Sequence, residues 1–189
     1  MTRFPLTPPR TFRATIQQIQ SRYHTCVGKT VYLSLGSNVG DCEANLRTAI
    51  ERVAELGEVV AVSSFYETEP VEFMAQPWFL NCAVALRTEL MPKLFLSKTL
   101  AIEQQMGRRR SQPKGPRTID IDILLFGNSV IHTPQLDVPH VAMHERRFVL
   151  EPLAEIAPEV RHPIFKRTVR EMLQVLPHNV GQVKNLARS

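Results

Sequence analysis

Residues 115–126 read Gly-Pro-Arg-Thr-Ile-Asp-Ile-Asp-Ile-Leu-Leu-Phe and place two carboxylates, Asp120 and Asp122, directly after a basic segment. If residues 119–126 form a strand, side chains alternate between its faces, so both acids share one face. The side chains predicted on the opposite, core-facing side are Ile119, Ile121, Ile123 and Leu125. Two residues along a strand separate the acids' Cα atoms by roughly 6.5 Å, a span that suits two divalent ions about 3.5–4 Å apart. The stretch therefore predicts a Mg²⁺ site for a polyphosphate.

The preceding residues, 108–117, carry five cationic side chains, no acid, two prolines and one glycine. This composition is typical of a loop. A cationic loop beside paired acids suits a metal-bound polyphosphate, because arginine forks can hold the phosphates from the side opposite the metals. The same residues are also compatible with a half-exposed edge strand and solvated charge, so the local pattern leaves both interpretations open.

Length and composition favour one domain. The chain has 189 residues, of which 43% are hydrophobic, which is enough for one well-buried core. We expect a basic extension over residues 1–30 that is partly disordered, a single domain over residues 31–177, and a tail over residues 178–189. The first 40 residues contain five basic side chains and no acid, so the remaining residues carry 18 basic and 18 acidic groups. This balance argues against a broad nucleic-acid-binding surface.

Cysteine usage favours a reducing compartment. Cys26, Cys42 and Cys82 are odd in number and lack Cys-x-x-Cys spacing, which indicates neither a disulfide framework nor a zinc site. No apolar run has the length of a membrane span, and the N-terminus lacks a secretory signal. We expect a cytoplasmic protein. Organelle import through residues 1–30 is the minority alternative, because that segment is basic and free of acids.

Apolar periodicity predicts strands and helices in the order β-α-β-β-α-β. The predicted strands are residues 31–36, 58–66, 78–88 and 119–126, and the predicted helices lie between Leu46 and Gly57 and between Pro92 and Gly107. This is the order of a ferredoxin-like α+β sandwich. The remaining residues are expected to add to this unit. Thr168 and Glu171 predict a capping box for a last helix that ends before Pro177.

Several segments together resemble the 6-hydroxymethyl-7,8-dihydropterin pyrophosphokinase family of the folate pathway. They keep the family's order between about residues 31 and 160, and the Gly-Pro-Arg-Thr-Ile-Asp-Ile-Asp segment is the most specific. The matching segments are residues 35–41 (Leu-Gly-Ser-Asn-Val-Gly-Asp), 63–68 (Ser-Ser-Phe-Tyr-Glu-Thr), 76–81 (Gln-Pro-Trp-Phe-Leu-Asn), 103–110, 115–122, 138–140 (Val-Pro-His) and 146–152. The resemblance implies transfer of the β,γ-diphosphate of ATP to the hydroxymethyl group of 6-hydroxymethyl-7,8-dihydropterin, which leaves AMP.

The resemblance also implies roles on the ATP side. Asp120 and Asp122 would hold two Mg²⁺ ions, which bridge the α- and β-phosphates and the β- and γ-phosphates. With Arg108 and Arg117 they form the expected catalytic group. The residues implied in ATP binding are Glu103, Arg108, Arg110, Arg117, Ile123, His140 and Arg146.

For the pterin, the resemblance implies a ring pocket and polar contacts. The residues implied in pterin binding are Thr68, Val71, Phe79, Asn81 and Phe148. Phe79 and Asn81 share one face of the predicted third strand, so a ring and an amide can converge on one pocket. Without the resemblance, both phenylalanines are typical core residues. Lys114 and Val141 stand where family members often carry aromatic residues.

Two further hypotheses belong to other classes. Ferredoxin-like sheets also bind RNA, and the cationic residues 108–117 fit such a role, although two acids would repel a phosphate backbone without metal. The chain could also be a catalytically idle partner of a neighbouring pathway enzyme. The leading interpretation is a monomeric, Mg²⁺-dependent diphosphokinase that uses ATP and can pass its product to a dihydropteroate synthase.

Overall fold

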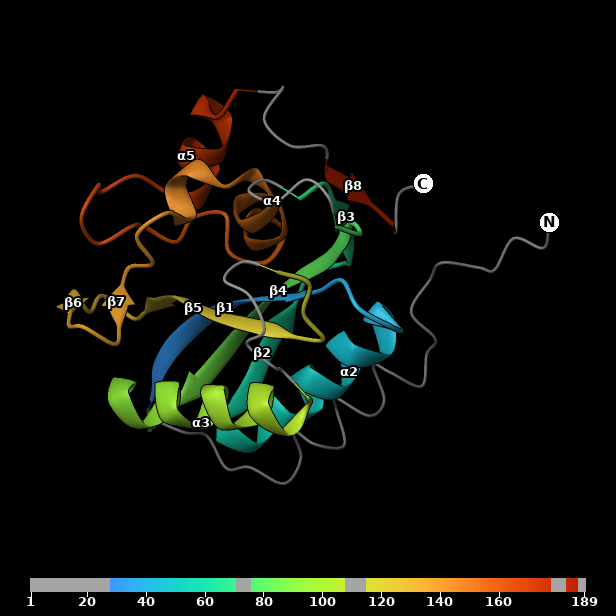
Figure 1. Cartoon of the computed structure of the whole chain (residues 1–189). Coiled ribbons are helices and arrows are strands. Elements are labelled where there is room, and N and C mark those ends of the chain that lie inside the picture. The colour runs from blue at the N-terminus through green and yellow to red at the C-terminus, as the bar shows by residue number, and fades with distance from the viewer. Residues whose placement is uncertain (1–27, 71–75, 108–114, 178–182, 187–189) are drawn as a thin grey trace.

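A computed structural model of the 189-residue chain describes residues 28–70, 76–107, 115–177 and 183–186. An antiparallel sheet of six strands separates two layers of helices (Figure 1). In order across the sheet, the strands are β5 (Asp120–Phe126), β1 (Lys29–Ser37), β4 (Phe79–Thr88), β3 (Tyr66–Thr68) and β8 (Val183–Asn185), and β2 (Glu58–Val62) pairs with the second half of β4. Two short strands, β6 (Ile131–His132) and β7 (Asp137–Val138), pair with each other.

The helices that follow β1 and β4 cover one face of the sheet, and the C-terminal helices cover the other (Figure 1). The first layer contains α2 (Cys42–Val53), the 3-10 helix η1 (Ala54–Leu56) and α3 (Pro92–Gln105); the second contains the 3-10 helix η2 (Met143–Glu145), α4 (Arg147–Ile156) and α5 (Val169–Val175). Asp41 caps α2 by accepting a hydrogen bond from the backbone N–H of Ala44 at 2.9 Å. Within the described ranges, no helix has the length and apolar character needed to cross a membrane.

The element order β1-α2-β2/β3-β4-α3-β5 confirms the predicted ferredoxin-like α+β sandwich. The second predicted strand, residues 58–66, is in fact divided. Its two parts pair with different halves of β4, and the break comes at Ser63. There the Ser63 backbone N–H donates to the Ala83 carbonyl while the Ser63 hydroxyl accepts from the Ala83 N–H, both at 2.9 Å. A side chain thus replaces one backbone partner, which sequence periodicity does not reveal.

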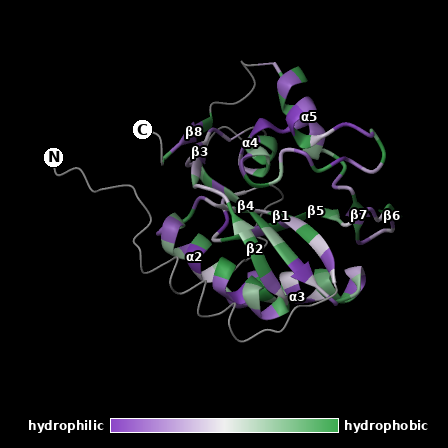
Figure 2. Ribbon diagram, turned by 180° about the vertical axis from the view of Figure 1, so that it is seen from behind, coloured by the Kyte–Doolittle hydropathy of each residue, from purple (hydrophilic) through white to green (hydrophobic). Residues whose placement is uncertain are grey.

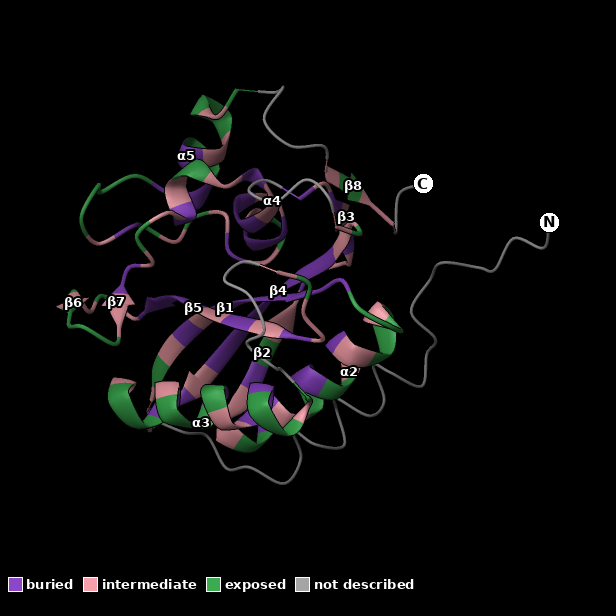
Figure 3. Cartoon of the chain, in the orientation of Figure 1, coloured by how far each residue is buried: buried purple, intermediate pink, exposed green. Residues whose placement is uncertain are grey.

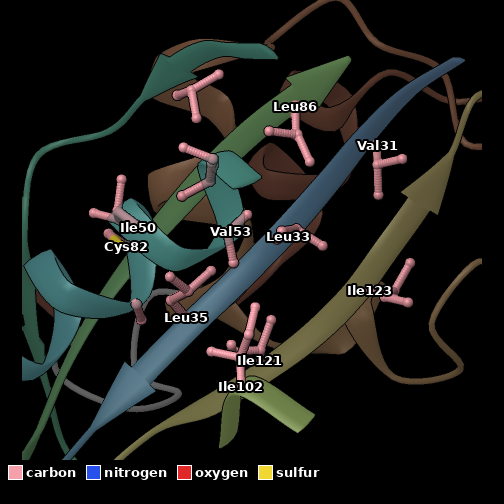
Figure 4. Packing of buried hydrophobic residues seen from close by; sticks show 14 of the residues in the cluster. Val31, Leu33, Leu35, Ile50, Val53, Cys82, Leu86, Ile102, Ile121 and Ile123 are labelled. Atoms are coloured by element: carbon pink, nitrogen blue, oxygen red, sulfur yellow. The ribbon is translucent and has the colours of Figure 1, made fainter. Parts of the chain in front are cut away.

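The main core lies between the sheet and the α2/α3 layer. Hydrophobic residues concentrate in the central strands and on the helix sides that face them (Figure 2), and these strands are largely buried (Figure 3). Val31, Leu33 and Leu35 of β1 pack with Ile121 and Ile123 of β5 in this core (Figure 4). The alternate residues of both strands therefore face the α4 side, where the cavity described below lies.

The alternation predicted for β5 fails after Ile123. The register of β5 against β1 shifts there, because Leu124 is an extra residue that pairs with no described residue of β1. Leu125 consequently packs in the second core, against α4 and α5, so the prediction that it shares a face with Ile123 is wrong. The carbonyl of Leu124 accepts a hydrogen bond from the backbone N–H of His140 at 2.9 Å, so the bulge anchors the segment after β7.

The C-terminal part adds elements to the sandwich. Thr168 and Glu171 form the predicted capping box at the start of α5, which ends at Val175, before Pro177. Strand β8 lies within residues 178–189, the segment expected to be a tail, and it pairs with β3 at the sheet edge. The domain limits at residues 30 and 177 stay predictions.

Candidate active site

A cavity opens on the α4 side of the sheet, where β5, β1 and β4 lie side by side. Its wall combines strand residues with the start of α4 and the segments that follow β3 and β7. The lining residues are Ser34, Gly36, Thr68, Glu69, Pro70, Gln76, Phe79, Asn81, Arg117, Asp120, Asp122, His140, Arg146 and Phe148.

Strand register brings the polar residues of this wall together. Gly36 in the central strand β1 pairs with Asn81 on one side and with Asp120 on the other, and Ser34 pairs with Asp122. Because side chains alternate along each strand, Ser34 and Gly36 face the cavity while their neighbours face the main core. The acids of β5 thus lie across one strand from Asn81 of β4.

The two acids differ in their electrostatic environment. Burial first and the charge of Asp120 second raise the pKa of Asp122 to about 7, although Arg146 and Arg117 oppose the shift. Asp120 accepts a hydrogen bond from Arg117 Nη1 at 2.6 Å in an ion pair. A buried carboxylate beside a second carboxylate ionises readily only when positive charge is supplied nearby. This donor set therefore suits a divalent cation.

The composition of the site is compatible with a Mg²⁺ ion that shares its ligands with a phosphate group. Among the described residues, no group of three or more His, Cys, Asp or Glu side chains is arranged to hold a metal ion. Two carboxylates are nevertheless enough for Mg²⁺, which usually keeps several waters and takes other ligands from substrate phosphates. The adjacent Arg117 and Arg146 are cationic groups of the kind that bind phosphate.

Asn38, in the turn after β1, ties three segments around the cavity. Its backbone N–H donates to the Arg117 carbonyl at 3.1 Å, and its side-chain Oδ1 accepts from the Arg117 N–H at 2.8 Å. Its Nδ2 donates to Gln76 Oε1 at 3.2 Å and to the Pro77 carbonyl at 3.1 Å. Asn38 is 3% exposed. It thus fixes the segments that carry Arg117 and Gln76, and sequence reasoning noted it only as part of a motif.

The other end of the cavity has aromatic walls and a buried amide. Phe79 comes from β4 and Phe148 from α4, and an arginine lies over each ring: Arg117 at 5.6 Å from the Phe79 centroid and Arg146 at 5.7 Å from that of Phe148. Asn81 Nδ2 donates to the Thr68 hydroxyl at 2.7 Å. That bond uses one of the two amide N–H groups, which leaves the second and the amide oxygen to bind a ligand.

His140 enters the cavity as a neutral group. Burial lowers its pKa, and the positive charge of Arg146 lowers it further. Its Nδ1 accepts a hydrogen bond from the Ala142 backbone N–H at 3.2 Å, so the proton of the neutral ring resides on Nε2. His140 can therefore donate a hydrogen bond to an anion.

Comparison with known proteins decides the family. Residues 32–158 match the profile of the family described as "7,8-dihydro-6-hydroxymethylpterin-pyrophosphokinase (HPPK)". The chain belongs to the HPPK family. The match covers more than half of the chain and includes the cavity.

Bacterial and eukaryotic proteins align over much of the HPPK region. The 2-amino-4-hydroxy-6-hydroxymethyldihydropteridine pyrophosphokinase of Bacillus subtilis is 50% identical over 131 residues, which are 68% of this chain and 78% of that protein. The protein of the same name from Methylorubrum extorquens is 46% identical over 156 residues, 81% of this chain and 98% of that protein. The folic acid synthesis protein fol1 of Schizosaccharomyces pombe is 38% identical over 170 residues, but this chain spans only 23% of its length.

Solved structures support the same fold. A crystal structure of HPPK-DHPS in complex with substrates superposes with a TM-score of 0.60 at 18% identity, covering 78% of this chain and 43% of that one. Plasmodium falciparum HPPK-DHPS with pteroate gives a TM-score of 0.65 at 18% identity, covering 80% of this chain and 43% of that one. Each of these solved chains is more than twice as long as the segment of it that aligns with the present chain.

Most of the predicted site residues meet in this cavity. Those that line it are Thr68, Phe79, Asn81, Arg117, Asp120, Asp122, His140, Arg146 and Phe148. Glu103 and Ile123, both among the described residues, do not line it. Ile123 packs in the main core, and Glu103, 3% exposed, accepts a hydrogen bond from the Ile121 N–H at 2.7 Å. Val71, Arg108 and Arg110 lie outside the described residues.

Five lining residues were missed by sequence reasoning: Ser34, Gly36, Glu69, Pro70 and Gln76. Two of them had a detectable signal. Ser34 and Gly36 alternate with the apolar residues of β1, as the acids do on β5, so the same alternation would have placed them together on one face. The others lie in irregular segments, whose path follows from contacts such as the bond between Gln76 and Asn38.

Proposed function

We propose that this HPPK-family chain transfers the β,γ-diphosphate of ATP to the hydroxymethyl group of 6-hydroxymethyl-7,8-dihydropterin in the cavity on β5, β1 and β4, and that the reaction depends on Mg²⁺. The hydroxyl oxygen attacks the β-phosphorus of ATP, and the bond from that phosphorus to the oxygen bridging the α- and β-phosphates breaks. AMP leaves, and the pterin diphosphate is formed with release of the hydroxyl proton. The family match and the composition of the cavity support this proposal.

Asp120 and Asp122 are the proposed Mg²⁺ ligands, two ions being expected with ATP. When bound, the ions offset the negative charge that develops around the β-phosphorus and help align the phosphates. The protein's part is to hold both carboxylates on one strand, at neighbouring positions of the cavity wall. Asp122 must be ionised to bind a cation, so its raised pKa makes metal binding pH-dependent.

Cationic and neutral donors hold the nucleotide in this proposal. Arg117 and Arg146 bind phosphate oxygens through their guanidinium forks, and His140 donates from Nε2. Arg117 is ion-paired with Asp120 at 2.6 Å in this structure, and it would be released to pair with phosphate if a metal ion held that carboxylate. Arg108 and Arg110 are also proposed to bind phosphate. Glu103 supports the site by accepting a hydrogen bond from the backbone of β5.

The pterin is proposed to lie between Phe79 and Phe148. A flat ring between two aromatic walls is held in a fixed plane, and the Asn81 amide can bind the donor and acceptor groups of its edge. Thr68 orients that amide through the 2.7 Å hydrogen bond. Orientation matters because this reaction involves no covalent enzyme intermediate, so positioning supplies much of the rate.

The observation that carries the proposal is that both acids of β5 line one cavity with Asn81 and two aromatic rings. The test measures AMP and pterin diphosphate with ATP, substrate and graded Mg²⁺. We expect Asp120→Asn and Asp122→Asn each to lower kcat by at least about 100-fold with little loss of folding, since a metal contributes several kcal/mol to such a step. Glu159→Gln makes the same chemical change at an exposed ion pair and should leave kcat unchanged. Full turnover in both aspartate variants, or in excess EDTA, contradicts the proposal.

Location, assembly and partners complete the proposal. The chain acts as a monomer in the cytoplasm and passes its product to a dihydropteroate synthase. Free thiols at Cys42 and Cys82 fit a reducing compartment, and solved HPPK-DHPS chains support a hand-off between the two activities. Light scattering after size-exclusion chromatography tests the monomer. Nothing in the comparisons supports the RNA-binding alternative, and RNA affinity measured with and without Mg²⁺ tests it directly.

A further inference from the structure

Strand β8 (Val183–Asn185) lies outside residues 32–158, the part that matches the HPPK profile, yet it belongs to the same sheet. It runs antiparallel to β3 at the sheet edge (Figure 1). Val183 pairs with Thr68 and Asn185 with Tyr66, and the backbone N–H of Leu186 donates to the Phe65 carbonyl at 3.0 Å. The C-terminal segment is therefore bound along the full length of β3.

A side-chain contact adds to this pairing. The ammonium group of Lys184 lies 4.7 Å from the centroid of the Trp78 ring, within the range of a cation–π interaction. Trp78 immediately precedes Phe79, the first residue of β4 and a wall of the cavity. Lys184 therefore contacts the residue that directly precedes β4, next to a wall of the cavity.

Strand β3 connects β8 to the pterin end of the cavity. On its other side, β3 pairs with β4, so Thr68 is opposite Phe79 and Tyr66 is opposite Asn81. Thr68 also accepts the hydrogen bond from Asn81, and Glu69, which follows it, lines the cavity. A three-residue strand has few ladder hydrogen bonds, so a partner on both sides holds it much more firmly than one.

We propose that β8 is a positioning element for the pterin: it keeps β3 in register with β4, and its Lys184 steadies Trp78, so that Thr68, Asn81 and Phe79 hold the shape that binds the pterin ring. This inference rests on the proposed placement of the pterin between Phe79 and Phe148. It assigns a role in substrate binding to a segment beyond the matched family region.

The proposed effect of β8 acts on the pterin end of the cavity rather than on the ATP end. In the sheet order β5-β1-β4-β3-β8, the acids of β5 lie at the edge opposite β8. His140 is held by the backbone of Leu124 on the same far strand. Loosening β8 should therefore weaken pterin binding much more than ATP binding. A general loss of folding acts differently, because it lowers the amount of active enzyme without changing one KM selectively.

The experiment uses the full chain with three substitutions at Lys184. Lys184 pairs with Glu67, two residues from the bonded pair of Phe65 and Leu186, so its backbone N–H faces β3. Lys184→Pro removes this donor, Lys184→Met removes the charge at similar length, and Lys184→Arg keeps a cation over Trp78. Trp78 is the only tryptophan of the sequence, so intrinsic fluorescence reports on this contact directly.

We expect Lys184→Pro to raise the KM for the pterin by about 10-fold, equal to about 1.4 kcal/mol, with the KM for ATP changed less than about 2-fold. Lys184→Met should shift the Trp78 emission and raise the pterin KM by a smaller factor. Lys184→Arg should leave both the emission and the pterin KM as in the unmodified protein. Lys98→Met, an exposed lysine of α3, is the matched control and should change neither. Thermal denaturation verifies that each variant is folded.

Three outcomes overturn the inference. Unchanged pterin KM in folded Lys184→Pro shows that β8 does not position the site. Equal increases in both KM values show a general structural role. A shift in Trp78 emission with a rise in the ATP KM alone shows that the pterin placement is wrong although β8 is coupled to the cavity. If the unmodified chain shows no Mg²⁺-dependent turnover, the proposed function itself is rejected.

Discussion

Gly36 of β1 and Asn81 of β4 are directly opposite each other, and the absence of a side chain at Gly36 makes room for the Asn81 amide. A Cβ at position 36 would lie 2.6 Å from Asn81 Oδ1 and 3.8 Å from Phe79 Cδ1. The first distance is far shorter than a van der Waals contact. The glycine of the Leu-Gly-Ser-Asn motif thus shapes the pocket across the sheet.

Gly36→Ala tests this relationship. We expect the new methyl group to displace the Asn81 amide from its hydrogen bond with Thr68 and to raise the KM for the pterin by on the order of 10-fold, as loss of about one well-made hydrogen bond would. Asn81→Ala provides the control, because Gly36→Ala should cost little more in that background. Steady-state kinetics of the two single variants and the double variant measure the coupling. Additive effects would contradict a direct clash.

Two substitutions of Asn38 distinguish its bond to Arg117 from its bonds to Gln76 and Pro77. Asn38→Ala removes the side-chain bonds to Arg117, Gln76 and Pro77 and should lower kcat and raise both KM values, with a stability loss of roughly 1–3 kcal/mol. Asn38→Asp keeps the acceptor for the Arg117 N–H but loses the donors to Gln76 and Pro77. We therefore expect Asn38→Asp to raise the pterin KM more than the ATP KM. Identical kinetics of the two variants would show that the Arg117 bond contributes nothing.

The sequence predicted the elements that depend on regular periodicity. Alternation placed Asp120 and Asp122 on one face of β5, and the same pattern in β1 would have placed Ser34 and Gly36 opposite them. It could not predict the bulge at Leu124, because an extra residue among Ile, Leu and Phe leaves the apolar pattern almost unchanged.

Long-range contacts were the second limit of sequence reasoning. Three-residue strands such as β3 and β8 carry too few residues for a periodicity. Their paired residues are 115 or more positions apart in the sequence, so local preference does not determine the pairing. Glu103 illustrates the same limit at the site. The resemblance implies a role for Glu103 near the nucleotide, which stays a prediction. The hydrogen bond that Glu103 accepts from the Ile121 backbone N–H, 18 residues away in the chain, was not foreseen.

Arg147 anchors the start of α4 between two cavity residues. Its Nη1 donates to Glu151 at 2.8 Å and its Nη2 donates to the Leu176 carbonyl at 2.9 Å, with the side chain only 9% exposed. We expect Arg147→Met to lower the free energy of unfolding by roughly 1–3 kcal/mol, because these partly buried acceptors lose their donor. Arg170→Met breaks an exposed pair with Glu159 and should cost less than about 1 kcal/mol. Urea denaturation compares them, and equal losses would contradict the anchoring role.

Asp122 should make the stability of the ligand-free protein depend on pH. Its pKa is raised from 3.8 to about 7 in the folded protein, by burial first and by Asp120 second. The folded state therefore holds a proton that the unfolded state releases between those values. Stability from this proton is complete below pH 4 and is lost as the pH rises through about 7.

Asp122→Asn removes this titration and tests the sign. In buffer without Mg²⁺ or ATP, the variant should gain stability over the unmodified protein as the pH rises from 4 to 7, by on the order of a few kcal/mol, and the difference should be constant above pH 8. Urea denaturation at each pH measures it, with Glu159→Gln as the exposed carboxylate control. A difference that is independent of pH would show that Asp122 ionises at its ordinary pKa, and that the cavity does not disfavour its charge before a cation arrives.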